Sequence, residues 1–109
     1  MKEVLPLNIH AIQLRAPWDR ILIDGQVCYQ RRFNLPTGLA VGDTVWIVIE
    51  GQGRQPLISC NDIPIKMAAD GEFEVTQTLA ANNKLQVTRL ENDAVFKSVR
   101  LEIRARDTP

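Results

Sequence analysis

The sequence predicts an all-β protein built as an antiparallel β-sandwich. Apolar and polar residues alternate with a period of two in several separate segments, which is typical of strands with one buried face. Turn-forming residues recur between these segments, and no window carries the 3.6-residue apolar period of an ordinary helix. About eight short strands at regular intervals, without helices, favour a sandwich or a barrel.

The expected strands follow one another along the chain. The clearest are VWIVIEG, in which Val45, Ile47 and Ile49 share one face, and VFKSVRLEIRA, in which Val99 and Leu101 do so. In chain order, the expected strands are 8–16, 27–33, 45–51, 56–60, 72–75, 84–88 and 95–105. Gly, Pro, Asn and Asp supply turns between them, at DG (24–25), PTG (36–38), VGD (41–43), GQG (51–53), NDIP (61–64) and ADG (69–71).

One connection is neither a tight hairpin turn nor a helix of ordinary length. In TQTLAANN (76–83), we expect Thr76 or Thr78 to cap one helical turn with its hydroxyl. We expect Leu79 to fold back onto the core, and Phe73, just before the connection, to be the second buried anchor. A long connection with buried anchors suits a strand that crosses from one sheet to the other, which is a Greek-key or jelly-roll device.

Length and charge limit the class of protein. The 109 residues predict a single domain, 1–109, with its core at about 8–105. Thirteen basic and thirteen acidic residues give a net charge of zero. We therefore expect no nucleic-acid or membrane partner, because phosphate binding needs a basic surplus. The sequence shows neither a secretory signal nor a long apolar run, which predicts a cytoplasmic protein with Cys28 and Cys60 as free thiols.

The residue inventory predicts a non-catalytic protein. There is one histidine, His10, and the two serines, Ser59 and Ser98, fall inside expected strands. No glycine loop opens a helix to cradle a phosphate, and the acidic stretches lack the alternating ligands of a strong calcium site. We expect no cofactor and no metal. A small hydrolase, built on surface carboxylates or on His10 with a cysteine, stays a remote alternative.

Three segments together resemble a known family. These are VWIVIEG (45–51), ISCND (58–62) and GEFEVTQTLAANNKLQV (71–87), preceded by LRAPW (14–18). They are similar to the N-terminal sugar-binding domain of family 2 glycoside hydrolases, such as β-galactosidase and β-glucuronidase, here as a stand-alone domain. The positions that fit this pattern are Gly51, Asn61, Phe73, Thr76, Leu79, Asn83, Leu85 and Val87. Two positions depart from it, Asp62 where the family has a glycine and Glu74 where it usually has Asp.

The resemblance implies a galactose-binding-like jelly roll that binds a carbohydrate. It also implies that the domain itself is not the catalyst, because the family's catalytic carboxylates lie in a separate barrel of about 250 residues. Sugar binding commonly uses an aromatic ring with polar groups around it. The candidate ligand-binding residues are Trp18, Trp46, Arg32, Arg54, Asn61 and Asp62.

A different class of function stays open beside the carbohydrate site. Both tryptophans could instead pack within the sandwich, and aromatic residues make up only 6% of the chain. The alternative is a structural or protein–protein interaction module with no sugar site, since a fold does not imply a function. An exposed aromatic ring among polar groups would favour sugar binding, and a large apolar patch on one sheet would favour a protein partner.

Overall fold

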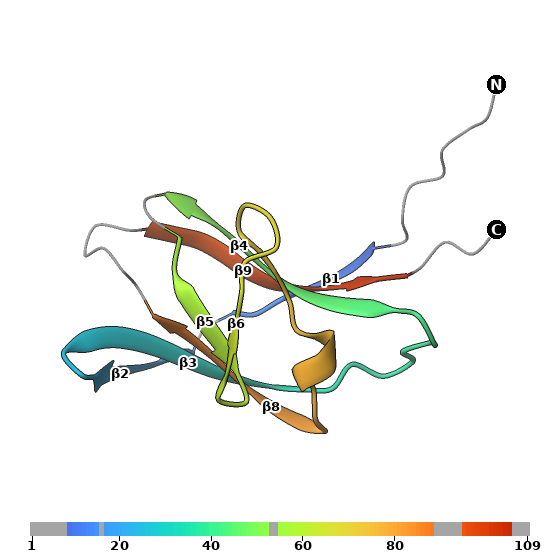
Figure 1. The fold of residues 1–109 in the computed structure, drawn as a ribbon, viewed down its shortest axis with the longest axis horizontal. Coiled ribbons are helices and arrows are strands. Elements are labelled where there is room, and N and C mark those ends of the chain that lie inside the picture. Colours follow the sequence, from blue (N-terminus) through green and yellow to red (C-terminus); the bar gives the residue numbers. More distant parts are fainter. Residues whose placement is uncertain (1–8, 16, 53–54, 89–94, 106–109) are drawn as a thin grey trace.

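The computed structural model describes residues 9–15, 17–52, 55–88 and 95–105, which form two antiparallel sheets packed as a sandwich (Figure 1). Sheet A has four strands in the order β1 (Ile9–Gln13), β9 (Val95–Arg104), β4 (Thr44–Gln52) and β7 (Glu72–Glu74). Sheet B has five in the order β2 (Asp19–Ile23), β3 (Gln26–Asn34), β8 (Asn82–Thr88), β5 (Leu57–Cys60) and β6 (Ile63–Ile65). The predicted all-β sandwich is confirmed.

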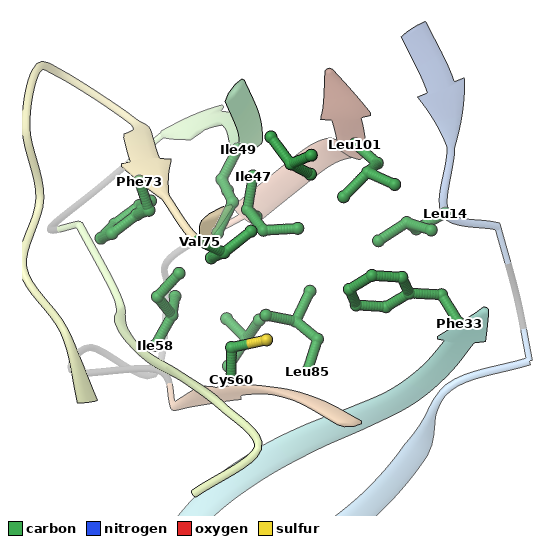
Figure 2. Close-up of a cluster of buried hydrophobic side chains, with 12 residues drawn as sticks. Leu14, Phe33, Ile47, Ile49, Ile58, Cys60, Phe73, Val75, Leu85 and Leu101 are labelled. Carbon is green, nitrogen blue, oxygen red and sulfur yellow. The ribbon is translucent and has the colours of Figure 1, made fainter. Parts of the chain in front are cut away.

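The core fills the space between the two sheets (Figure 2). Sheet A supplies alternate residues of β4 and β9, among them Ile47 and Leu101, and sheet B supplies Ile58, Leu85 and Phe33. The period-two pattern therefore assigns the inward faces correctly. Val48, Glu102 and Cys28 are also buried, but they lie outside this cluster, on the outer faces of their sheets.

The connection after β7 crosses from sheet A to sheet B as predicted. It contains one 3-10 turn, η1 (Thr76–Thr78), shown in orange in Figure 1. Phe73 is buried, with 2% of its surface exposed, and Leu79 is partly buried against the core. Both anchors thus lie where the sequence predicted, although Leu79 is less deeply buried than Phe73.

The predicted threonine cap of this turn is wrong. Val75 occupies the N-cap position and makes no side-chain capping bond. Instead, the Thr76 hydroxyl accepts a hydrogen bond from the backbone N–H of Val45 on β4, at 2.9 Å. The Thr78 hydroxyl donates back to the Val75 carbonyl oxygen, at 2.8 Å. The two hydroxyls therefore fasten the turn to sheet A and to the preceding residue rather than closing its own N–H groups.

Two short strands escaped the sequence prediction, and both belong to hairpins at edges of sheet B. β2 pairs with β3 through Asp24 and Gly25, which both have positive φ. β6 pairs with β5 through Asn61 and Asp62, which also both have positive φ. Positive φ at both central residues is the mark of a two-residue turn that matches the twist of the flanking strands. β6 also holds Pro64, which is tolerated because this strand has a free edge.

A pair of asparagines fixes the crossover to sheet B. Asn83 has no exposed surface, and its side-chain oxygen accepts hydrogen bonds from Ala80 N at 2.7 Å and from Asn61 Nδ2 at 2.9 Å. Asn61 Nδ2 also donates to the Thr78 carbonyl oxygen at 2.7 Å, and Asn61 Oδ1 accepts from Lys84 N at 2.9 Å. Buried amides are stable only when they are paired in this way.

Cys28 and Cys60 are both free thiols, as predicted. They lie on β3 and β5, which β8 separates. Cys60 faces the core, whereas Cys28 lies on the outer face, with its sulfur 3.2 Å from the Thr88 hydroxyl.

Candidate functional site

A hollow of about 560 Å³ opens beside β1 and β3, where the two sheets come together. This volume falls in the usual range for small-molecule sites. Its walls come from β1 and the residue after it, from the end of β3 and the loop that follows, and from single residues of β8 and β9. The lining residues are Ile12, Gln13, Leu14, Arg31, Arg32, Phe33, Asn34, Pro36, Asn82 and Leu101.

The local chain path explains why the hollow exists. β1 ends at Gln13 because the next two carbonyl oxygens bond to side chains rather than to a strand. The Leu14 carbonyl accepts from Trp18 Nε1 at 3.1 Å, and the Arg15 carbonyl accepts from Arg31 Nε at 2.6 Å. Leu14 N still donates to the Val99 carbonyl oxygen of β9 at 2.9 Å. Leu14 lies beside Phe33 (Figure 2), and both residues line the hollow.

Arg31 is a polar group of the hollow whose guanidinium is held by hydrogen bonds to the backbone. It is half-buried on β3, and a second nitrogen, Nη1, donates to the Arg32 carbonyl oxygen at 2.9 Å. Its remaining nitrogen, Nη2, has no acceptor among the residues that the structure describes. Two backbone bonds thus hold the guanidinium in place and leave hydrogen-bond donors for a ligand.

The lining offers both hydrogen-bonding and apolar groups. Gln13, Asn34 and Asn82 contribute amides, which both donate and accept. Ile12, Pro36 and Leu101 contribute apolar surface. The ionisable residues of the lining are both arginines, and arginine stays protonated in proteins. This lining therefore contains no nucleophile and no group that could exchange a proton near neutral pH.

A second polar cluster covers the outer face of sheet A. Alternation along β9 puts Arg100, Glu102 and Arg104 on one face. Glu102 accepts hydrogen bonds from Arg100 Nε at 2.6 Å and from Arg104 Nη2 at 2.8 Å. Arg100 also pairs with Glu50 at 2.6 Å, and Arg104 with Glu72 at 2.7 Å. Carboxylates of the protein itself thus compensate the charges of both arginines.

Burial and hydrogen bonding oppose each other at Glu102. Burial raises the pKa of its carboxyl group, but the hydrogen bonds from Arg100 and Arg104 outweigh burial and lower that pKa below its ordinary value. Hydrogen bonding to Glu102 in turn raises the pKa of Arg100. Glu102 is therefore ionised at neutral pH, and its charge and that of Arg100 stabilise each other.

The structure separates the two predicted tryptophans from each other. Trp18 is half-buried against the core, and its indole nitrogen bonds to the Leu14 carbonyl, so it supports the wall of the hollow. Trp46 lies on the outer face of sheet A. The Arg104 guanidinium covers its ring there, with Cζ 4.3 Å from the ring centroid. That ring face is already engaged in a cation–π contact and does not offer an open stacking platform.

The remaining predicted residues lie in sheet B or outside the described residues. Asn61 and Asp62 share the β5–β6 turn, where Asn61 serves the crossover and Asp62 pairs with Lys84 at 2.9 Å. Arg32 is exposed beside Lys84 on the outer face of sheet B and also lines the hollow. Arg54 lies outside the residues that the structure describes.

Of the predicted residues that the structure describes, Arg32 alone belongs to the lining of the hollow. Sequence reasoning missed Arg31, Asn34, Asn82 and Gln13. The signal that was available is the run QRRFN, in which two adjacent arginines fall inside an expected strand. Adjacent strand residues point to opposite faces, so one arginine of the two had to face the sandwich.

Comparisons with known proteins leave the function open. No family model matches the chain, and neither a curated protein nor a solved structure matches it. Within the described ranges, no group of three or more His, Cys, Asp or Glu residues could hold a metal ion. In the same residues, no helix is long and apolar enough to cross a membrane.

Proposed function

We propose that the protein is a non-catalytic binding module whose ligand is a carbohydrate, taken up in the hollow beside β1 and β3. The observation that carries this proposal is the lining itself. It combines amides and arginines with apolar residues and includes no proton-exchanging group. Sugars present hydroxyls and apolar C–H faces together, so they need a concave site of this mixed kind.

The strand order supports a galactose-binding-like jelly roll as the fold of this module. In sheet A the order is β1-β9-β4-β7, and in sheet B it includes β3-β8-β5-β6. The chain changes sheets between β1 and β2, β3 and β4, β4 and β5, β6 and β7, β7 and β8, and β8 and β9. Repeated changes of this sort build the two facing four-stranded sheets of a jelly roll, with β2 as an additional edge strand.

The thiols support a non-catalytic role. Cys60 is buried in the core, and burial raises the pKa of its thiol, which is the opposite of what activates a nucleophile. His10 on β1 pairs in register with Ile103 and is exposed. Cys60 and His10 therefore do not support the remote alternative of a small hydrolase.

A glycan array with the purified chain and blocked variants tests the proposal. Asn34 and Asn82 face each other in register at the hollow, and both are exposed. We expect the unaltered chain to bind a subset of glycans, and Asn34→Trp or Asn82→Trp to abolish this binding by filling the hollow. Lys66→Trp is the matched control, because Lys66 is exposed and does not line the hollow. Binding that persists in both blocked variants, or binding to no glycan at all, would overturn the proposal.

A protein–protein interaction module is the second candidate, and an exposed leucine on the outer face of sheet B favours it. Ile21, Cys28, Thr88 and Leu57 lie side by side across four strands on the outer face. Leu57 is 58% exposed. This candidate predicts self-association that Leu57→Asp removes and Asn34→Trp leaves unchanged, as measured by sedimentation velocity over a range of concentrations.

A further inference from the structure

The hollow carries a positive charge that no carboxylate of its lining neutralises. Arg31 and Arg32 both line it, and the lining includes no acidic residue. Neither arginine forms an ion pair among the described residues. By contrast, Lys84, which lies opposite Arg32 on β8, has its charge offset by Asp62 at 2.9 Å.

The partners of Arg31 hold its guanidinium without cancelling its charge. Its Nε and Nη1 bond to the carbonyl oxygens of Arg15 and Arg32, at 2.6 and 2.9 Å. Carbonyl oxygens are neutral acceptors, so the net charge of the group remains. The two hydrogen bonds are exposed to water, but they fix the orientation of the guanidinium. An oriented guanidinium without a carboxylate partner is a favourable partner for a carboxylate or a sulfate.

We infer that the ligand of the hollow is an anionic sugar, whose charged group binds Arg31. This inference rests on the proposed carbohydrate function and specifies its ligand class. The charged group would take the free Nη2 side of Arg31, with Arg32 adding positive potential from the neighbouring position. The amides of Gln13, Asn34 and Asn82 would hydrogen-bond to the sugar hydroxyls. Ile12 and Leu101 would pack against the C–H face of the sugar ring.

Titration of the full chain with matched small sugars, followed by backbone amide NMR shifts, tests this inference. The probes are sodium glucuronate, glucose 6-sulfate and glucose, which differ in charge but little in size. We expect glucuronate or the sulfate to bind at least about ten-fold more tightly than glucose, because hydrogen bonds to charged partners are the stronger ones. Raising NaCl should weaken binding of the charged probe and leave glucose unchanged. The preferred charged probe identifies the anionic group.

Variants assign the effect to Arg31. Arg31→Gln should remove most of the preference for the charged probe, and Arg31→Lys should retain part of it, because Lys keeps the charge but not the planar fork. Arg20→Gln is the matched control, since Arg20 is exposed on β2 and does not line the hollow. Retention of folding is checked by the dispersion of the amide spectrum.

The possible failures are distinguishable. Equal affinity for glucose and glucuronate, unchanged by Arg31→Gln, would overturn the anionic ligand and leave the carbohydrate function standing. A preference that Arg20→Gln removes as strongly as Arg31→Gln would also overturn it. A third outcome is that the chain binds no glycan on the array and that none of the three sugars shifts the amide resonances of the hollow. This outcome would overturn the proposed carbohydrate function, and the present inference with it.

Discussion

Two pairs of arginines in this protein have opposite surroundings. Arg100 and Arg104 on β9 share Glu102 between them, and each has a further carboxylate within 2.7 Å. Arg31 and Arg32 on β3 have only carbonyl oxygens or solvent as partners in the described part of the chain. Carboxylates of sheet A thus compensate the charges of the first pair, whereas no described carboxylate compensates those of the second pair, as the proposed anionic ligand requires.

Strand geometry produces this difference. Arg100, Glu102 and Arg104 are two residues apart, so all three point to the same face, where β4 and β7 add Glu50 and Glu72. Arg31 and Arg32 are consecutive and point to opposite faces. Their partners in register on β8 are Leu85 and Lys84, neither of which is a carboxylate.

Removal of the shared carboxylate should have the largest effect on stability. Glu102 is only 6% exposed, and Glu102→Ala leaves two partly buried arginines with one partner each. Breaking a fully buried ion pair costs about 3–5 kcal/mol. Arg100 and Arg104 keep side-chain exposures of 21% and 18% and retain Glu50 and Glu72. We therefore expect a loss of about 2–3 kcal/mol in the free energy of unfolding, measured by urea denaturation.

Glu50→Ala is the control for this change. Glu50 binds the same Arg100, but its side chain is 57% exposed. Exposed ion pairs contribute at most about 1 kcal/mol, so this variant should unfold close to the unaltered chain. Equal losses in the two variants would show that Glu102 is no more than an ordinary surface carboxylate, and the contrast between the arginine pairs would fail.

The arginines themselves provide a smaller and more direct comparison. Arg100→Gln removes two charged hydrogen bonds and leaves Glu102 dependent on Arg104, which should cost about 1–2 kcal/mol. Arg32→Gln removes no described ion pair and should change the free energy of unfolding by less than about 0.5 kcal/mol. Chemical denaturation of both variants measures this. A loss of more than 1 kcal/mol in Arg32→Gln would assign Arg32 a structural role and weaken its place in the hollow.

Most of the sandwich could be predicted because burial of one face imposes alternation. Seven expected strands match β1, β3, β4, β5, β7, β8 and β9 of the structure. β2 and β6 lack that signal for physical reasons. β2 is an edge strand exposed along most of its length, and Pro64 interrupts β6. Their pairing comes instead from two-residue turns. The sequence predicts the positions of these turns but not the short strands β2 and β6 beside them.

The hollow could not be predicted from the sequence, because it arises from tertiary packing. It joins Ile12 to Leu14 with Arg31 to Asn34, segments that are far apart in the chain and lie in different sheets. Asn61 attracted attention as a polar loop residue, yet its amide is committed to Asn83 and to the Thr78 carbonyl. A polar residue in a turn thus identifies a ligand site only when its hydrogen bonds are known.

The pH dependence of stability gives the smallest and most selective test of the comparison. The pKa of Glu102 is lowered in the folded protein, so its contribution to stability is present above the unfolded pKa of a glutamate, about 4.3. That contribution is lost as the pH falls through the lower, folded pKa. Glu102→Gln keeps the shape but removes the titration. We therefore expect the gap in the free energy of unfolding between the unaltered chain and Glu102→Gln to be widest near neutral pH and to narrow below about pH 4.

Urea denaturation of the unaltered chain and of Glu102→Gln across this pH range measures the difference in their free energies of unfolding. The other carboxylates titrate in both proteins, so their effect largely cancels in this difference. Arg31→Gln serves as the reference, because Arg31 has no described carboxylate partner, and its gap to the unaltered chain should stay constant with pH. A constant gap for Glu102→Gln would mean that its charge contributes nothing to folding. A gap for Arg31→Gln that narrows in acid would mean that Arg31 has a carboxylate partner after all, and its charge would then not be available to an anionic sugar.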